Sequence, residues 1–144
     1  MLRALRPRLR YVGVEPSAYA VGRFGTARGL RQGSVETLDA LRLHEEYPEG
    51  FDLVVCCGVL NYVPTRALGA ALELLQVHTS GLAWLEIFTQ HDAIEGDVAA
   101  LTPRPASWYR ERFRRAGLVP CGLHLYAPAD RAAGLTALET GRIS

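Results

Sequence analysis

Short apolar runs alternate along the chain with stretches of helical periodicity, a pattern that predicts strands separated by helices. The first strand is expected over Tyr11–Glu15, and Ser17 is a suitable N-cap for a helix over residues 18–28. Gly29 ends that helix, and residues 30–34 predict a second short strand. The N-terminal third of the chain therefore predicts a strand–helix–strand unit.

The most apolar strand is expected over residues 51–57, FDLVVCC. It lacks polar alternation, which predicts that both of its faces are buried, as in a parallel sheet covered by helices. Further elements are expected as follows: the end of an amphipathic helix at 2–9, a loop with a helical turn at 35–47, helices at 65–78 and 106–115, strands at 82–88, 118–126 and 135–138, and a loop at 90–104. The alternation predicts one α/β domain over residues 1–144, with a mostly parallel, Rossmann-like sheet and helices on both faces.

Composition narrows the class of protein. With 144 residues, of which 49% are hydrophobic and 22% charged, the chain can bury a core and is not expected to be disordered. No apolar run reaches the length of about 18 residues that a membrane span needs. A net charge of +1 provides no field for binding nucleic acid or an anionic membrane, so neither is expected as a partner.

The types of reactive residue exclude several chemistries. All 16 basic residues are arginine, so Schiff-base and Walker-type lysine mechanisms are excluded. The three cysteines form no disulfide framework, which favours a reducing, cytoplasmic location. The four histidines are scattered and no Cys-x-x-Cys spacing occurs, so no metal site is expected.

An acid ends the first predicted strand. Ligands of open α/β sheets bind beyond the carboxyl ends of the strands, where the Glu15 carboxylate could accept hydrogen bonds from both hydroxyls of a ribose. Gly13 would allow close approach of an adenosine-containing cofactor. A solvated strand-end glutamate is the plain alternative.

Two further turns are expected at the same edge of the sheet, Gly33–Val35 and Cys57–Leu60. Their order and spacing after Glu15 resemble those of the class I S-adenosylmethionine-dependent methyltransferases, and the resemblance covers roughly residues 1–126. It implies that Glu15 holds the ribose, that the turn with Gly33 holds the adenine edge, and that the hydrophobic turn packs against the cofactor. The cofactor-binding residues so implied are Gly13, Glu15, Ser34, Val35, Cys57, Gly58, Val59 and Leu60.

The chain departs from that family in two respects. Ser34 stands where the family usually has an acid, and the family's first strand, with its Gly-x-Gly-x-Gly loop, is absent. That strand lies between the strand ending in Glu15 and the strand at 51–57, and each buried backbone group left unpaired by its loss costs about 1–3 kcal/mol. Three arrangements stay open: a longer protein, direct pairing of the flanking strands, or a second chain in the gap, as in a homodimer.

The resemblance implies methyl transfer from S-adenosylmethionine to a small-molecule acceptor, with S-adenosylhomocysteine as product. A general base is needed only if the acceptor loses a proton, and the candidates are Tyr62, Glu86, His91 and Asp92. Each has a plainer reading: Tyr62 as packing, Glu86 as one member of an ion pair, and His91 with Asp92 as a hydrated loop. Trp108 and Tyr109 would line an acceptor pocket or, more simply, belong to the core.

Two other functions compete with catalysis. One is a non-catalytic, methyltransferase-like interaction module that oligomerises through exposed strand edges. The other is binding of a nicotinamide dinucleotide. In folds that bind this cofactor an acid ends the second strand of the sheet, and Glu15 would be that acid here.

Overall fold

The alternation of apolar runs and helical stretches is realised in a computed structural model that describes residues 9–95 and 100–134. Its strands are β1 (Gly13–Glu15), β2 (Leu30–Gln32), β3 (Phe51–Cys57), β4 (Thr79–Glu86), β5 (Leu118–Pro120) and β6 (Leu125–Pro128). Its helices are α2 (Ala18–Arg28), the 3-10 helix η1 (Val35–Leu41), α3 (Leu43–Glu46), α4 (Thr65–Val77), α5 (Ala106–Arg115) and α6 (Ala129–Ala132). The expected α/β class is confirmed. The strand expected at 135–138 and all but the last residue of the helix expected at 2–9 lie outside the described residues.

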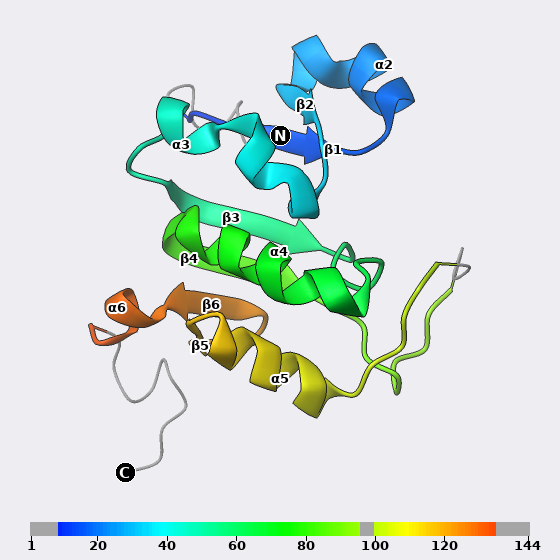
Figure 1. Cartoon of the computed structure of the whole chain (residues 1–144), viewed down its shortest axis with the longest axis vertical. Coiled ribbons are helices and arrows are strands. Elements are labelled where there is room, and N and C mark those ends of the chain that lie inside the picture. Colours follow the sequence, from blue (N-terminus) through cyan, green and yellow to red (C-terminus); the bar gives the residue numbers. More distant parts are fainter. Residues whose placement is uncertain (1–8, 96–99, 135–144) are drawn as a thin grey trace.

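The strands form two hydrogen-bonded sheets rather than one. β1 pairs with β2 in parallel, and the second sheet has the order β3-β4-β6-β5. In that second sheet β3 and β4 are parallel, whereas β6 is antiparallel to both β4 and β5. The sheet is thus mixed, not mostly parallel. In Figure 1 the β1–β2 pair lies beyond β3, and the arrows of β1 and β3 point the same way.

β1 and β3 form no ladder with each other in the part of the chain that the structure describes. Direct pairing of the two strands that flank the gap was one of three arrangements that the sequence left open, and it does not occur. The alternating direction of the backbone groups along β3 shows which of them do not pair with β4. The Gly58 N–H donates to the Glu86 carbonyl across the β3–β4 pair, so the N–H and C=O groups of Leu53 and Val55 point away from β4.

Local signals in the sequence explain the strand–helix–strand unit. The Ser17 hydroxyl accepts a hydrogen bond from the Ala20 N–H at 3.2 Å and so caps α2, as predicted. Gly29 adopts a left-handed conformation with φ 63° at the other end, where a side chain would be strained. The chain then returns directly into β2.

The core lies between the second sheet and the helices on one of its faces. The buried face of α4 repeats at helical spacing and packs with buried residues of β3 and β4, and α5 adds two aromatic rings. η1 packs against α4 and contributes Val35 and Leu38. Figure 1 shows α4 and α5 side by side across the same face of the sheet. These core residues include Cys56, Leu68, Ala71, Leu72, Leu75, Ala83, Leu85, Tyr109 and Phe113.

The opposite face of β3 is open, which corrects the expectation that both faces of this strand are buried. Leu53 is 54% exposed and Val55 is 61% exposed. Both lie on one side of the pleat, whereas the neighbouring Cys56 is buried on the other. An apolar run shows that a strand has little polar surface, but it does not show what covers that surface.

The strand predicted at 118–126 is in fact a hairpin of β5 and β6. The chain turns around Gly122 and His124, and His124 has a positive φ of 57°. Cys121 N–H donates to the Leu125 carbonyl at 3.0 Å and closes the turn. The prediction was wrong because apolar residues on both sides of the turn favoured one strand, although Pro120 and Gly122 mark a turn between them. The helix before it was predicted correctly, with Gly117 at φ 72° just beyond its end.

Candidate functional site

The carboxyl ends of β1 and β2 bring two of the predicted turns together. The strands are in parallel register, with Glu15 opposite Gln32. The Gly33 N–H donates to the Glu15 carbonyl at 3.1 Å, so the acid and the turn that begins at Gly33 are neighbours. The carboxyl end of β3 faces the same side of the molecule in Figure 1. All three predicted turns therefore follow strands that end on one side.

The Glu15 side chain already has a local partner. Its Oε1 accepts a hydrogen bond from the Ser17 N–H at 2.9 Å, which ties the carboxylate to the start of α2. Glu15 is partly exposed. One carboxylate oxygen thus has a structural role, and the residue stays accessible from solvent.

The side chains of Leu30 and Tyr11 lie close to Gly13. A Cβ there would lie 2.6 Å from Leu30 Cδ2 and 2.9 Å from the Tyr11 hydroxyl oxygen. The space that the sequence assigned to an approaching cofactor is thus occupied by the protein's own side chains. Gly13 therefore contributes first of all to the packing between β1 and β2.

The turn after β2 is built as a helix start. The Ser34 N–H donates to Thr37 Oγ1 at 2.9 Å, and the two hydroxyl oxygens are 3.4 Å apart. Ser34 is partly exposed and can offer its hydroxyl to a ligand. Val35, in contrast, is only 8% exposed and belongs to the core.

The turn after β3 exposes some of its residues and buries others. Gly58 has φ 65°, which favours glycine, and no atom lies within 4 Å of the position that a Cβ would take. Val59 is 44% exposed, whereas Leu60 is fully buried. The Cys57 thiol is exposed, and its pKa is raised by partial burial and by the nearby Glu86 carboxylate. The turn thus presents Cys57, Gly58 and Val59 outward and is anchored by Leu60.

A buried polar network holds this turn, and sequence reasoning missed it. Asn61 is fully buried; its side chain donates to the Phe88 carbonyl and accepts from the Phe88 N–H. Arg104 is 4% exposed and donates to the Val63 carbonyl at 2.7 Å. The only signal in the sequence was an arginine between two prolines in an expected loop, Pro103 and Pro105.

The four candidate bases are placed differently. Tyr62 is 45% exposed in the turn after β3, and Glu86 is partly exposed at the end of β4, opposite Cys57. The ion-pair partner expected for Glu86 is not found among the described residues. The Asp92 carboxylate accepts a hydrogen bond from the Thr89 N–H, which lowers its pKa and makes it a weaker base.

His91 is exposed beside Asp92, and its backbone N–H donates to Thr89 Oγ1 at 3.4 Å. The two residues belong to a hydrogen-bonded turn after β4. In this geometry the plainer reading, a hydrated loop, describes both of them.

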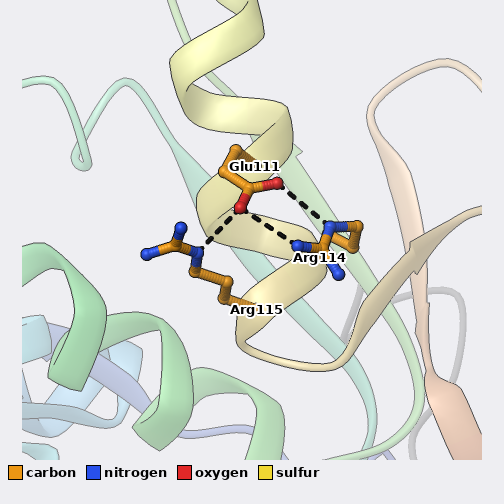
Figure 2. A network of polar contacts seen from close by, with 3 residues as sticks. All are labelled: Glu111, Arg114 and Arg115. Atoms are coloured by element: carbon orange, nitrogen blue, oxygen red, sulfur yellow. Dashed lines mark hydrogen bonds and ion pairs between the residues drawn. The ribbon is translucent and has the colours of Figure 1, made fainter.

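A shallow hollow of about 410 Å³ lies elsewhere, along α5 from Pro105 to Arg115. Trp108 lines it, and Tyr109 is buried in the core instead. Glu111 also lines the hollow and forms ion pairs with Arg114 and Arg115, as Figure 2 shows. None of the residues predicted to bind the cofactor lines this hollow.

The described residues provide neither a metal site nor a membrane-spanning helix. They contain no cluster of three or more His, Cys, Asp or Glu side chains that could hold a metal ion. No helix among them has the length and apolar character needed to cross a membrane. The three cysteines, Cys56, Cys57 and Cys121, are free thiols.

Comparison with known proteins adds one match. A family model described as a methyltransferase domain matches residues 1–79 of the chain. This match covers more than half of the 144 residues and includes β1, β2, β3 and α4, the elements that carry the three turns. Among curated proteins, none matches the chain.

Proposed function

Because the chain belongs to the methyltransferase domain family, we propose that it transfers a methyl group from S-adenosylmethionine to a small-molecule acceptor. The observation that supports this donor is the hydrogen bond between the Gly33 N–H and the Glu15 carbonyl, which puts a strand-end acid next to a serine hydroxyl. The open space at Gly58 and the exposed Val59 fit an apolar ring on the same side of the molecule. Together, a carboxylate, a hydroxyl and an apolar side chain suit the diol of a ribose and the ring of a base.

Each residue would have a defined role in binding. The Glu15 carboxylate would accept hydrogen bonds from the ribose hydroxyls, and the Ser34 hydroxyl would meet the edge of the adenine. Val59 would pack on the base. The bound sulfonium supplies an electrophilic methyl group, and its transfer leaves a neutral thioether that needs no protonation. The task of the protein is then to hold the acceptor in line, which is worth up to about 7–11 kcal/mol of the barrier.

The acceptor side is proposed more coarsely. A small molecule fits better than nucleic acid, because the net charge is only +1. Where the acceptor must lose a proton, we favour Glu86, which pairs with Cys57 at the end of β4, and Tyr62, which is exposed in the turn after β3. We place the protein in the cytoplasm, since its three cysteines are free thiols.

Glu15→Gln tests the donor site. The amide oxygen of glutamine can still accept from the Ser17 N–H, so α2 should start normally, while the charge-assisted bonds to a diol are lost. Calorimetry with S-adenosylhomocysteine should show binding weaker by about 1.5–3 kcal/mol, the range for a hydrogen bond to a charged group. Glu36→Gln is the matched control, since Glu36 is an exposed acid in the first turn of η1.

The same titration separates the rival ligands. Equal affinity of wild type and Glu15→Gln for S-adenosylhomocysteine would remove Glu15 from the site. Binding of NAD in place of S-adenosylhomocysteine would favour the nicotinamide dinucleotide function. Absence of both would leave the donor site without support.

One observation favours a second candidate function, an interaction module that forms a homodimer. The Leu53 and Val55 side chains are exposed on the open face of β3. The backbone groups on the edge of β3 that points away from β4 have no partner strand in the described part of the chain. Sedimentation over a range of concentrations tests this candidate. A dimer that Val55→Glu converts into a monomer would support it, whereas a wild-type monomer at all concentrations would contradict it.

A further inference from the structure

Arg104 is a buried cation whose partners among the described residues are all neutral. One terminal nitrogen donates to the Tyr109 hydroxyl at 3.0 Å and lies 3.4 Å from the Leu60 carbonyl oxygen. The other donates to the Val63 carbonyl at 2.7 Å and to Thr65 Oγ1 at 3.1 Å. Its Nε is buried and has no hydrogen-bond partner in residues 9–95 and 100–134. A charge is costly to bury, so its presence here calls for a reason.

The partners of Arg104 share a location. Leu60, Val63 and Thr65 lie in or next to the turn between β3 and α4, 39–44 residues away along the chain. The planar guanidinium reaches two carbonyl groups of this turn at once, those of Leu60 and Val63. Arg104 therefore connects the segment before α5 to the turn after β3.

A second connection runs in parallel. The Thr102 N–H donates to the Asn61 carbonyl at 3.0 Å, and the Asn61 side chain is bonded to Phe88 in the loop after β4. Residues 102–104 thus hold the turn after β3 from one side, and Phe88 holds it from another. Gly58 and Val59 lie immediately before this anchored part; the Gly58 N–H donates to the Glu86 carbonyl, and the Val59 carbonyl accepts from the Tyr62 N–H.

We infer that Arg104 is a positioning residue, which holds the turn at 58–60 in the conformation that receives the methyl donor; this role rests on the proposed function. The guanidinium acts through the Leu60 and Val63 carbonyls rather than by touching the ligand. Removing it leaves those buried carbonyls without their donor, and the turn is free to reorient.

Three variants test the inference. Arg104→Met removes the donors and keeps most of the side-chain length, whereas Arg104→Lys keeps a charge but loses the planar fork. Arg112→Met is the matched control: Arg112 and Arg104 both stack on the Trp108 ring at 4.9 Å, but Arg112 has no hydrogen bond to the turn in the described structure. All measurements are made below the melting temperature of the least stable variant.

Two readouts go beyond stability. In Arg104→Met the dissociation constant of S-adenosylhomocysteine should rise at least about tenfold, with a smaller rise in Arg104→Lys and less than about twofold in Arg112→Met. Hydrogen exchange of the Tyr62 amide, which donates to the Val59 carbonyl inside the turn, should accelerate in the same order.

The outcomes separate the inference from the proposed function. If wild type does not bind S-adenosylhomocysteine but Tyr62 exchange still accelerates in Arg104→Met, the proposed function fails and the positioning of the turn stands. If wild type binds and Arg104→Met binds equally well with unchanged Tyr62 exchange, the inference is overturned. Should Arg104→Met fail to fold, the comparison of Arg104→Lys with Arg112→Met decides in the same way.

Discussion

At the scale of single residues, the clearest electrostatic feature is Glu111 on α5. Its carboxylate accepts hydrogen bonds from Arg114 and from Arg115 at 2.8–3.0 Å, and the Arg114 bonds contribute most to lowering its pKa to about 2. Figure 2 shows both guanidinium groups turned toward this one carboxylate. The side chains are exposed, so the contribution to stability is small and screened by salt.

The sign of the pH effect follows from that lowered pKa. A carboxyl group with a folded pKa near 2 and an unfolded pKa near 4.5 stabilises the fold fully above pH 4.5, and this part is lost as the pH falls toward 2. As the pH is lowered from 4.5 toward 2, the melting temperature of Glu111→Gln should therefore fall less steeply than that of the wild type. Carboxyl NMR titration checks the pKa directly, and a midpoint near 4.5 would contradict the ion pairs.

The two adjacent cysteines should react very differently. Burial raises the pKa of the Cys56 thiol to about 12, with a smaller effect from Cys57. Cys57 is exposed beside the candidate donor site. Alkylation at pH 8 with peptide mass mapping should modify Cys57 in the native protein and Cys56 only after unfolding, because the thiolate is the reactive form.

The same labelling reports on the site. S-adenosylhomocysteine should slow alkylation of Cys57 if the turn after β3 contacts it, and leave Cys121, which lies on the β5–β6 hairpin beyond β4, unchanged. Equal slowing of both thiols would indicate a general effect on the protein instead. Native labelling of Cys56 at the rate of Cys57 would contradict the buried position of Cys56.

At the scale of elements, Gly81 allows β3 and β4 to approach closely. A Cβ at Gly81 would lie 2.3 Å from the Asp52 carbonyl oxygen, at the point where the register of the two strands shifts. The neighbour is backbone and cannot rotate away. Gly81→Ala should therefore destabilise the fold by about 1–3 kcal/mol, the usual cost of overpacking, as measured by urea unfolding.

Gly69 supplies the matched control for Gly81→Ala. It lies inside α4, where no atom is within 4 Å of a Cβ, so alanine adds helix propensity at no steric cost. Gly69→Ala should stabilise by about 0.5–1 kcal/mol. The same sign for both variants would show that the close approach at Gly81 relaxes without cost.

The sequence predicted elements well where a local signal exists. Ser17, Gly29 and Gly117 mark helix ends by their chemistry, and the structure has helix ends at those positions. In the β5–β6 turn Pro120 and Gly122 are such markers, but the apolar residues on both sides predicted one strand, and the positive φ of His124 cannot be read from the residue type. Arg104 could not be recognised either, since its partners are about 40 residues away and periodicity says nothing about such contacts.

The candidate site shows the same division. The neighbourhood of Glu15 and Gly33 follows from strand order and was predictable in principle. The exposure of Val59, the burial of Leu60 and the packing of Leu30 and Tyr11 against Gly13 depend on tertiary contacts and were not. A spacing in the sequence fixes which strand end a residue follows, but not what already fills the space there.

At the scale of the whole molecule, the division into two sheets predicts a pattern of amide exchange along β3. Val54 and Cys56 face β4 and pair with it, whereas the amides of Leu53 and Val55 face the open edge. Because local opening energies range from near zero to the full stability, the Val54 and Cys56 amides should exchange at least about a hundredfold more slowly than those of Leu53 and Val55.

The concentration dependence of this exchange shows whether the edge stays open. In a monomer the Val55 amide exchanges fast at every protein concentration. Protection of Val55 that grows with concentration would mean that a second copy pairs with the edge, as the interaction-module function requires. Protection that is strong and independent of concentration would contradict the separation of β1–β2 from β3 itself. Amide exchange on this one strand therefore tests the architecture and the choice between the two candidate functions with the same measurement.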